Sequence, residues 1–216
     1  MVLVSLLRRG APCNHYSWST YNQIMSEATQ KNYEAPLPCG WGKNTIEGIA
    51  ERFAVAINFK CDDEIEPVVS RLGGSIEYED FPLENAMLAG WIEVEGTKDF
   101  RIRLNNDANS IRDRFTIAHE LGHYVLHYLF ALEKRGNFKL SANLIDGKRQ
   151  GLDPDPENEA NYFALALLMP KIAFTESYNA NTSVVKHKNP LELVATKFGV
   201  PIWAVNARAD SLELIK

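Results

Sequence analysis

The sequence predicts an α+β fold, in which helices accompany a small antiparallel sheet and a C-terminal helical segment follows. Three observations lead to this prediction. Apolar residues recur with helical spacing over residues 46–59, 114–127 and 157–169. Runs with the composition of strands lie between the first two of these helices. A helix–glycine–helix pattern over residues 191–209 has helix-turn-helix spacing.

The chain divides into three parts by composition. Residues 1–42 are irregular and rich in Asn, Ser and Tyr, and we interpret them as an N-terminal extension. The main domain is expected over residues 43–180, and it opens with the helix at 46–59 and a shorter helix at 64–72. Residues 181–216 are expected to form the C-terminal helical segment.

Three strands are expected at residues 75–79, 90–95 and 100–104, and a glycine-containing turn joins the last two as a hairpin. Apolar and basic residues alternate from Phe100 to Leu104, which predicts one buried and one solvated face. Arg101 and Arg103 lie on the solvated face. They could tune the choice of a bound peptide, but a plain solvated surface is the preferred interpretation.

The helix at 114–127 contains the motif His119-Glu120-Leu121-Gly122-His123. Residues four apart share a helix face, so two imidazoles so placed can bind one divalent metal. Glu120 can reach a metal-bound water as a general base without being a ligand. A core helix with two hydrogen-bonded histidines is the competing interpretation. Gly122 costs about 1 kcal/mol relative to Ala in mid-helix, which predicts close approach by a neighbouring element.

A catalytic zinc ion needs a third protein ligand. A third histidine of the metzincin type is excluded, because Leu126 and Leu129 stand where its glycine and histidine belong. His127 is about 12 Å from His119 along the helix axis, too far to share the metal. It is expected at the surface or behind a ligand histidine, and a structural role is preferred. Cys13 and His15 are a minor alternative metal pair.

The third ligand is expected on a second helix, which follows the Asp- and Pro-rich residues 152–156. Glu157 and Asn161 are four residues apart and share a face, so Asn161 could hydrogen-bond a ligand histidine. Glu159 lies about 200° round the helix from Glu157. Glu157 is preferred as the ligand. Glu159 remains the rival, and otherwise it is an exposed first-turn acid that favours the helix dipole.

The motif residues, together with Glu157-x-Glu-Ala-Asn-x-Phe-Ala164 and Leu167-Leu-Met-Pro170, resemble the ImmA/IrrE family of metallopeptidases. The resemblance implies a zincin-like fold with an antiparallel edge strand beside the motif helix, where an extended peptide could bind by strand addition. It also implies that Zn²⁺, or Mn²⁺ as a substitute, is bound by His119, His123 and Glu157, with Glu120 as the catalytic carboxylate. Asn161 stands where many gluzincins have Asp. Tyr162 is a weak candidate for stabilising the oxyanion, and a core role is preferred.

The family resemblance further implies an endopeptidase with a narrow substrate range, acting on a helix-turn-helix repressor or antitoxin encoded nearby in a bacterial, phage or mobile-element genome. The alternative function is a regulatory or toxin-like module of a toxin–antitoxin or stress-response pair, which binds its partner and cleaves little.

Composition bounds the remaining possibilities. A net charge of −5 and a pI near 5.6 argue against a nucleic-acid protein driven by bulk positive charge. The chain has no apolar run long enough for a membrane span and no recognisable signal peptide, and its three scattered cysteines suit a reducing cytoplasm. Residues 132–151 are expected to form a mobile loop over the cleft. Arg208 is the only basic residue on the last helix, so packing or partner docking is preferred there over DNA binding.

Overall fold

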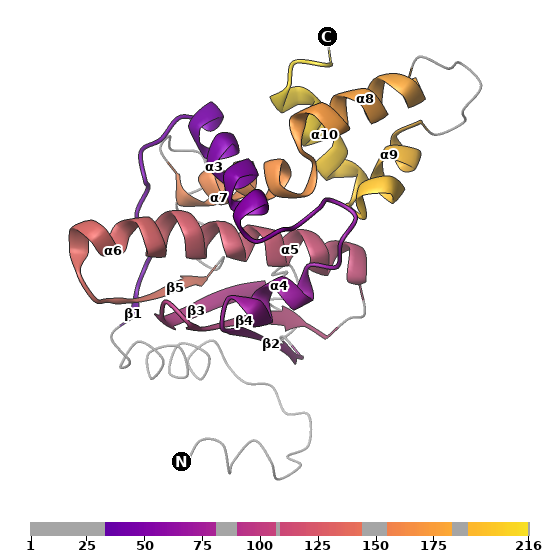
Figure 1. Ribbon diagram of the computed structural model, residues 1–216. Coiled ribbons are helices and arrows are strands. Elements are labelled where there is room, and N and C mark those ends of the chain that lie inside the picture. Colours follow the sequence, from indigo (N-terminus) through magenta and orange to yellow (C-terminus); the bar gives the residue numbers. More distant parts are fainter. Residues whose placement is uncertain (1–32, 81–89, 107–108, 144–154, 183–189, 216) are drawn as a thin grey trace, which may run out of the picture. The chain divides into compact units, whose positions relative to one another are not determined.

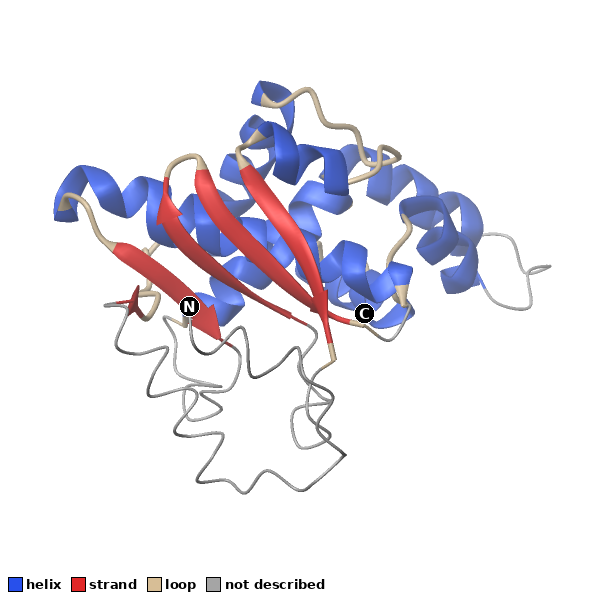
Figure 2. Cartoon of the chain, turned by 90° about the horizontal axis from the view of Figure 1, so that it is seen from below, coloured by secondary structure: helices blue, strands red, loops and turns tan. Residues whose placement is uncertain are grey.

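A five-stranded sheet supports the helices that carry the motif residues. The computed structural model describes residues 33–80, 90–106, 109–143, 155–182 and 190–215, and residues from Glu34 onward belong to one compact unit. The helices of that unit lie on one face of the sheet, behind the strands in the view of Figure 2. The mixed α+β class that the sequence predicts is therefore confirmed.

The sheet has the strand order β1-β5-β3-β4-β2. Its strands are β1 (Tyr33–Glu34), β2 (Gly74–Glu79), β3 (Gly90–Gly96), β4 (Asp99–Asn105) and β5 (Lys139–Asn143). The hairpin predicted between β3 and β4 is present, and β5 pairs antiparallel with β3. The prediction of an antiparallel sheet was wrong for β2, which pairs parallel with β4. Strand β3 runs opposite to β2, and the β3–β4 hairpin reverses the chain once more, so β4 runs in the same direction as β2.

The alternation expected along β4 is present. Phe100, Ile102 and Leu104 are buried, whereas Arg101 and Arg103 are partly exposed on the other face. Both arginines form ion pairs with the glutamates of β2 and β3, among them Glu77 and Glu93. Since β4 is flanked by a strand on each side, it is not an edge at which a peptide could add as another strand.

One long helical stretch crosses the sheet (Figure 1). It consists of α5 (Ser110–Gly122), a π-helical segment η2 (His123–Leu129) and α6 (Phe130–Arg135). The side chain of Asn109 caps its start by accepting from the backbone N–H of Arg112. π-helical segments are rare and occur mainly at functional sites. This one begins at the second histidine of the motif.

Helix α7 (Pro156–Leu168) packs between α5 and α3 (Lys43–Ala56). Its start is as the sequence predicts, because Asp155 caps the helix through the N–H of Glu157 and Pro156 occupies the first turn. The core lies between the sheet and these helices, and Ile92, Ile117 and Phe163 belong to one buried cluster.

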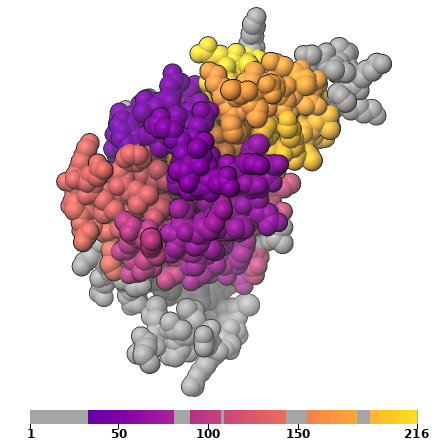
Figure 3. All heavy atoms as spheres, viewed as in Figure 1, coloured from indigo at the N-terminus to yellow at the C-terminus, as the bar shows by residue number. Residues whose placement is uncertain are grey.

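The remaining helices are α4 (Glu66–Arg71), α8 (Lys171–Thr182), α9 (Pro190–Phe198) and α10 (Ile202–Ser211). The end of α10 lies beside the start of α3, because Ser211 donates to Glu47. In Figure 3 the yellow C-terminal residues accordingly lie next to the indigo residues of the chain. Arg208 is fully buried; it donates to the carbonyl of Met169 and pairs with Glu47. The only basic side chain of α10 therefore points into the core rather than toward a DNA phosphate.

The prediction of a loop over residues 132–151 was partly wrong, because α6 extends to Arg135 and residues 139–143 form β5. Residues 144–151 of that prediction lie outside the described residues. Within the part of the chain that is described, no helix is long and apolar enough to cross a membrane.

Candidate metal centre

Helices α5 and α7 lie in close contact at Gly122. A Cβ atom built on Gly122 would lie 3.1 Å from both the Cα and the carbonyl oxygen of Ala160. Such contacts are tighter than ordinary van der Waals contact, so a side chain here would push α7 away. The close approach that Gly122 predicts is confirmed, and it brings the first turn of α7 next to the motif histidines.

Three side chains from these helices converge on one point. The Nε2 atoms of His119 and His123 are 3.1 Å apart. Glu157 completes the group, with one carboxylate oxygen 3.1 Å from His119 Nε2 and the other 3.3 Å from His123 Nε2. His119 and His123 are almost fully buried, and Glu157 is the most exposed of the three.

The size of this group suits a zinc ion. Ligand atoms about 2.0–2.1 Å from a tetrahedral zinc lie about 3.3 Å from one another. The two Nε2 atoms are 3.1 Å apart, and His119 Nε2 and His123 Nε2 lie 3.1 and 3.3 Å from the nearer oxygen of Glu157. The donor set of two imidazoles and one carboxylate is also one that catalytic zinc ions use, with a fourth position left for water.

The electrostatics of the group favour a cation. Burial lowers the pKa of His123 to about 4, so this ring is neutral at pH 7. Although burial opposes it, hydrogen bonding to the two imidazoles holds the pKa of Glu157 well below its usual range. Burial would also lower the pKa of His119, but the contact with Glu157 raises it. A cation bound here would displace any proton held between His119 Nε2 and Glu157.

Glu120 lies beside this group and is almost completely buried. Burial raises its pKa to about 8, and the charge of Glu157 adds to the shift. Among the described residues, its Oε2 atom has no hydrogen-bond partner. Buried carboxylate oxygens are normally hydrogen-bonded, so an unpaired one indicates a place for a ligand or a reacting water.

His119 is oriented from behind by α7. Its Nδ1 atom lies 3.0 Å from Oδ1 of Asn161, as the spacing of Glu157 and Asn161 predicts. Because an amide oxygen only accepts, His119 Nδ1 carries a proton, so the Nε2 lone pair of the neutral ring faces Glu157 and His123. Asn161 thus does for His119 what an outer carboxylate does in many metal sites.

The expectation that Glu159 is an exposed acid was wrong. Its side chain is buried and lies 2.8 Å from His127 Nε2, and it accepts from the backbone N–H groups of Cys39 and Gly40. Burial opposes the effect, but these hydrogen bonds lower its pKa. His127 is buried and hydrogen-bonded to His123, so the surface position was wrong and the position behind a motif histidine is the one observed. In the sequence, the only indication of the His123–His127–Glu159 contacts is that His127 follows His119 and His123 at the same four-residue spacing.

Other candidate sites do not join this group. Tyr162 is partly buried and packs against the core, whereas Cys13 and His15 lie outside the described residues.

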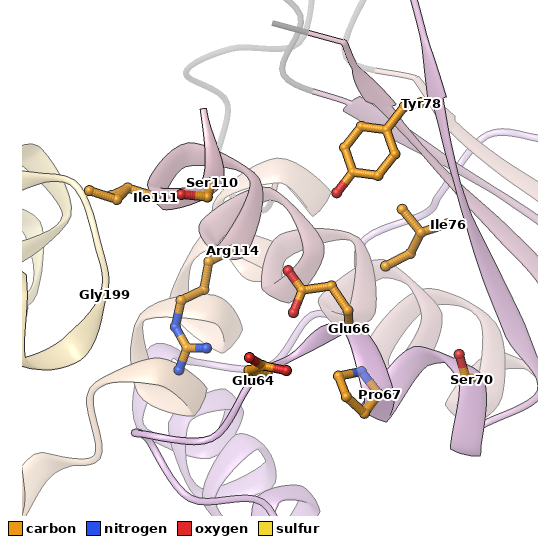
Figure 4. A pocket seen from close by; sticks show the side chains of 10 residues that line it. All are labelled: Glu64, Glu66, Pro67, Ser70, Ile76, Tyr78, Ser110, Ile111, Arg114 and Gly199. Atoms are coloured by element: carbon orange, nitrogen blue, oxygen red, sulfur yellow. The ribbon is translucent and has the colours of Figure 1, made fainter. Parts of the chain in front are cut away.

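A separate open hollow of about 910 Å³ lies between β2, α4 and the start of α5 (Figure 4). Arg114 and Glu66 line it, and none of the motif residues does. The guanidinium of Arg114 is held by backbone carbonyls, including those of Cys61 and Asp63.

Comparison with known proteins agrees with the geometry. A family model for M78 peptidases, described as the IrrE N-terminal-like domain, matches residues 69–210, which is more than half of the chain. The match contains the motif helix and α7. No curated protein sequence matches the chain. The chain belongs to the ImmA/IrrE family of metallopeptidases.

Proposed function

We propose that this peptidase is a zinc-dependent endopeptidase, with His119, His123 and Glu157 as metal ligands and Glu120 as general base. The observation that carries the proposal is the convergence of three side chains, whose facing ligand atoms are 3.1–3.3 Å apart, beside a buried carboxylate oxygen that lacks a partner among the described residues. We propose Mn²⁺ as a substitute, because the carboxylate of Glu157 also suits it.

In the proposed reaction, Asn161, Glu120 and Glu157 have different roles. When bound, zinc acts as a Lewis acid, which polarises the peptide carbonyl and lowers the pKa of a water molecule to about 7. Asn161 holds His119 with its Nε2 lone pair facing the ligand group. A bound cation would lower the pKa of about 8 that burial gives Glu120. The ionised Glu120 is placed to take the proton of the attacking water, and afterwards to pass it to the amine that leaves. The partial exposure of Glu157 leaves the group accessible from its side.

The substrate that we propose is a helix-turn-helix repressor or antitoxin encoded near this chain's gene. Membership in the ImmA/IrrE family supports this substrate class. The burial of Arg208 supports a protein partner over direct DNA binding, since the basic residue that α10 could offer to phosphate is held by Glu47. We further propose that the protein acts in the cytoplasm, where its cysteines would remain reduced.

A co-expression experiment tests this function. The chain and the candidate repressor are produced together, and mass spectrometry is used to look for repressor fragments. Glu120→Gln is the matched control, because it keeps the size of the side chain and removes the base. We expect zinc to stay bound while cleavage falls by at least about 100-fold. Equal amounts of fragments with both proteins would exclude Glu120 as the base.

The same experiment separates the regulatory alternative. Repressor that binds but stays intact, with the same cellular phenotype for wild type and Glu120→Gln, would favour a binding module over a peptidase. Zinc-free protein that takes up no metal on reconstitution would overturn the metal site itself.

A further inference from the structure

A chain of buried hydrogen bonds runs behind His123. Its Nδ1 atom lies 2.9 Å from Nδ1 of His127, and His127 Nε2 lies 2.8 Å from Oε2 of Glu159. The two oxygens of Glu159 in turn accept from the backbone N–H groups of Cys39, at 2.9 Å, and Gly40, at 3.0 Å. His123, His127 and Glu159 are each at most 4% exposed.

With His127 neutral, the far end of this chain sets the direction of each hydrogen bond in it. Glu159 receives backbone N–H groups on both oxygens, so it acts as an acceptor and His127 Nε2 must carry a proton. A neutral imidazole has one N–H and one lone pair, so His127 Nδ1 then accepts. The proton between the two Nδ1 atoms therefore belongs to His123, and its Nε2 is left with the lone pair.

We propose that His127 and Glu159 are positioning residues, which hold His123 in the one tautomer and ring orientation that can bind a metal. This inference rests on the proposed zinc site. The Nε2 lone pair of His123 points at the same place as Nε2 of His119 and the carboxylate of Glu157. Carboxylate partners behind a ligand imidazole make the ligand more basic and fix its orientation. Here a second imidazole stands between the two.

A different role for the same residues is a second metal site, since ligand atoms of Cys39, His127 and Glu159 lie within 4.8 Å of one another. That site would need the Nε2 lone pair of His127. His127 Nδ1 would then carry the proton shared with His123, and His123 would lose its metal-binding lone pair. The two sites exclude each other as long as both rings are neutral. Burial also raises the pKa of the Cys39 thiol to about 12, which disfavours the thiolate that metals bind.

Two substitutions of His127 separate the ends of the hydrogen-bonded chain. In His127→Asn the amide oxygen can take the place of Nδ1 and still accept from His123, but the contact with Glu159 is lost. In His127→Gln the amide nitrogen can take the place of Nε2 and still donate to Glu159, but the acceptor for His123 is lost. Zinc affinity is measured by competition with a chelator, and the stability of the metal-free protein by thermal denaturation.

We expect His127→Gln to lower zinc affinity by about 10–100-fold, the usual cost of losing a partner behind a ligand. His127→Asn should retain most of the affinity, even if its metal-free form is the less stable of the two. A purely structural role predicts the opposite, namely that affinity follows stability. Wild-type affinity in His127→Gln, or equal losses in both variants, would overturn the positioning role.

Two further measurements close the remaining outcomes. Cys39→Ser keeps the backbone N–H and should bind one zinc with unchanged affinity; a second equivalent of zinc that disappears in Cys39→Ser would show the second metal site instead. If His127→Gln does not fold, Glu159→Gln takes its place and should weaken zinc binding about 10-fold. Wild-type protein that binds no metal would overturn the proposed function. A zinc affinity that is unchanged in these variants would overturn only the positioning role.

Discussion

Glu157 and Glu159 stand two residues apart in the first turn of α7, yet their surroundings are opposite. Glu157 faces the Nε2 atoms of both motif histidines and is partly exposed. Glu159 is almost fully buried, and it contacts His127 together with the backbone before α3. The more buried acid is thus the one farther from the candidate metal. Both oxygens of Glu159 accept from protein donors, whereas a ligand such as Glu157 must keep an oxygen for the ion.

The strongest test of this contrast is Glu157→Gln. Losing a charged ligand should weaken zinc binding by more than about 100-fold, because even a partner behind a ligand costs 10–100-fold. Chelator competition measures the effect, with Glu159→Gln as the matched control that changes the same side chain two residues away. A larger loss of zinc in Glu159→Gln than in Glu157→Gln would reverse the assignment of the two acids.

Asn161→Ala sharpens the comparison from the His119 side. Removal of the amide oxygen frees the Nδ1 proton of His119, so zinc affinity should fall by about 10–100-fold. Asn161→Asp is the control, because a carboxylate at this position can accept the same proton and should bind zinc at least as tightly as wild type. Tighter binding in Asn161→Ala than in Asn161→Asp would contradict the role of the amide.

Gly122→Ala should have the smallest effect, and it should act on both sides of α7 at once. The added methyl group lies against the backbone of Ala160, which sits between Glu159 and Asn161. Overpacking costs about 1–3 kcal/mol, and the better helix propensity of Ala returns about 1 kcal/mol, so a modest net loss of stability is expected. Chemical denaturation of the metal-free protein gives this value, and Gly48→Ala, at a looser position in α3, is the control. Unchanged stability in Gly122→Ala would show that α7 can move without cost.

Much of the candidate site could be predicted from local sequence. The periodicity of residues 114–127 and the spacing of His119 and His123 require one face of one helix. The acids and prolines before α7 predict where it starts, and that start determines which residues share a face with Glu157. Gly122 predicts a close neighbour without naming it. All of these inferences use spacings of a few residues, over which helix geometry determines where a side chain points.

The rest depended on contacts between distant segments. In the sequence, Glu159 looks like any first-turn acid. In the structure, the backbone at Cys39 and Gly40, about 120 residues earlier, lies against its carboxylate. The parallel pairing of β2 with β4 is likewise a contact between strands that are not consecutive in the chain, and their local sequences do not specify it.

Sequence alone thus determined the family, the α+β class, the motif helix and the positions of the residues proposed as ligands. Only the tertiary structure decided which buried groups support them, and that Arg208 pairs with Glu47 inside the core. The physical reason is the distance along the chain over which each interaction acts. Helix and strand periodicities act over one or two turns, whereas a buried polar group takes as its partner whichever distant segment the fold brings within hydrogen-bond distance.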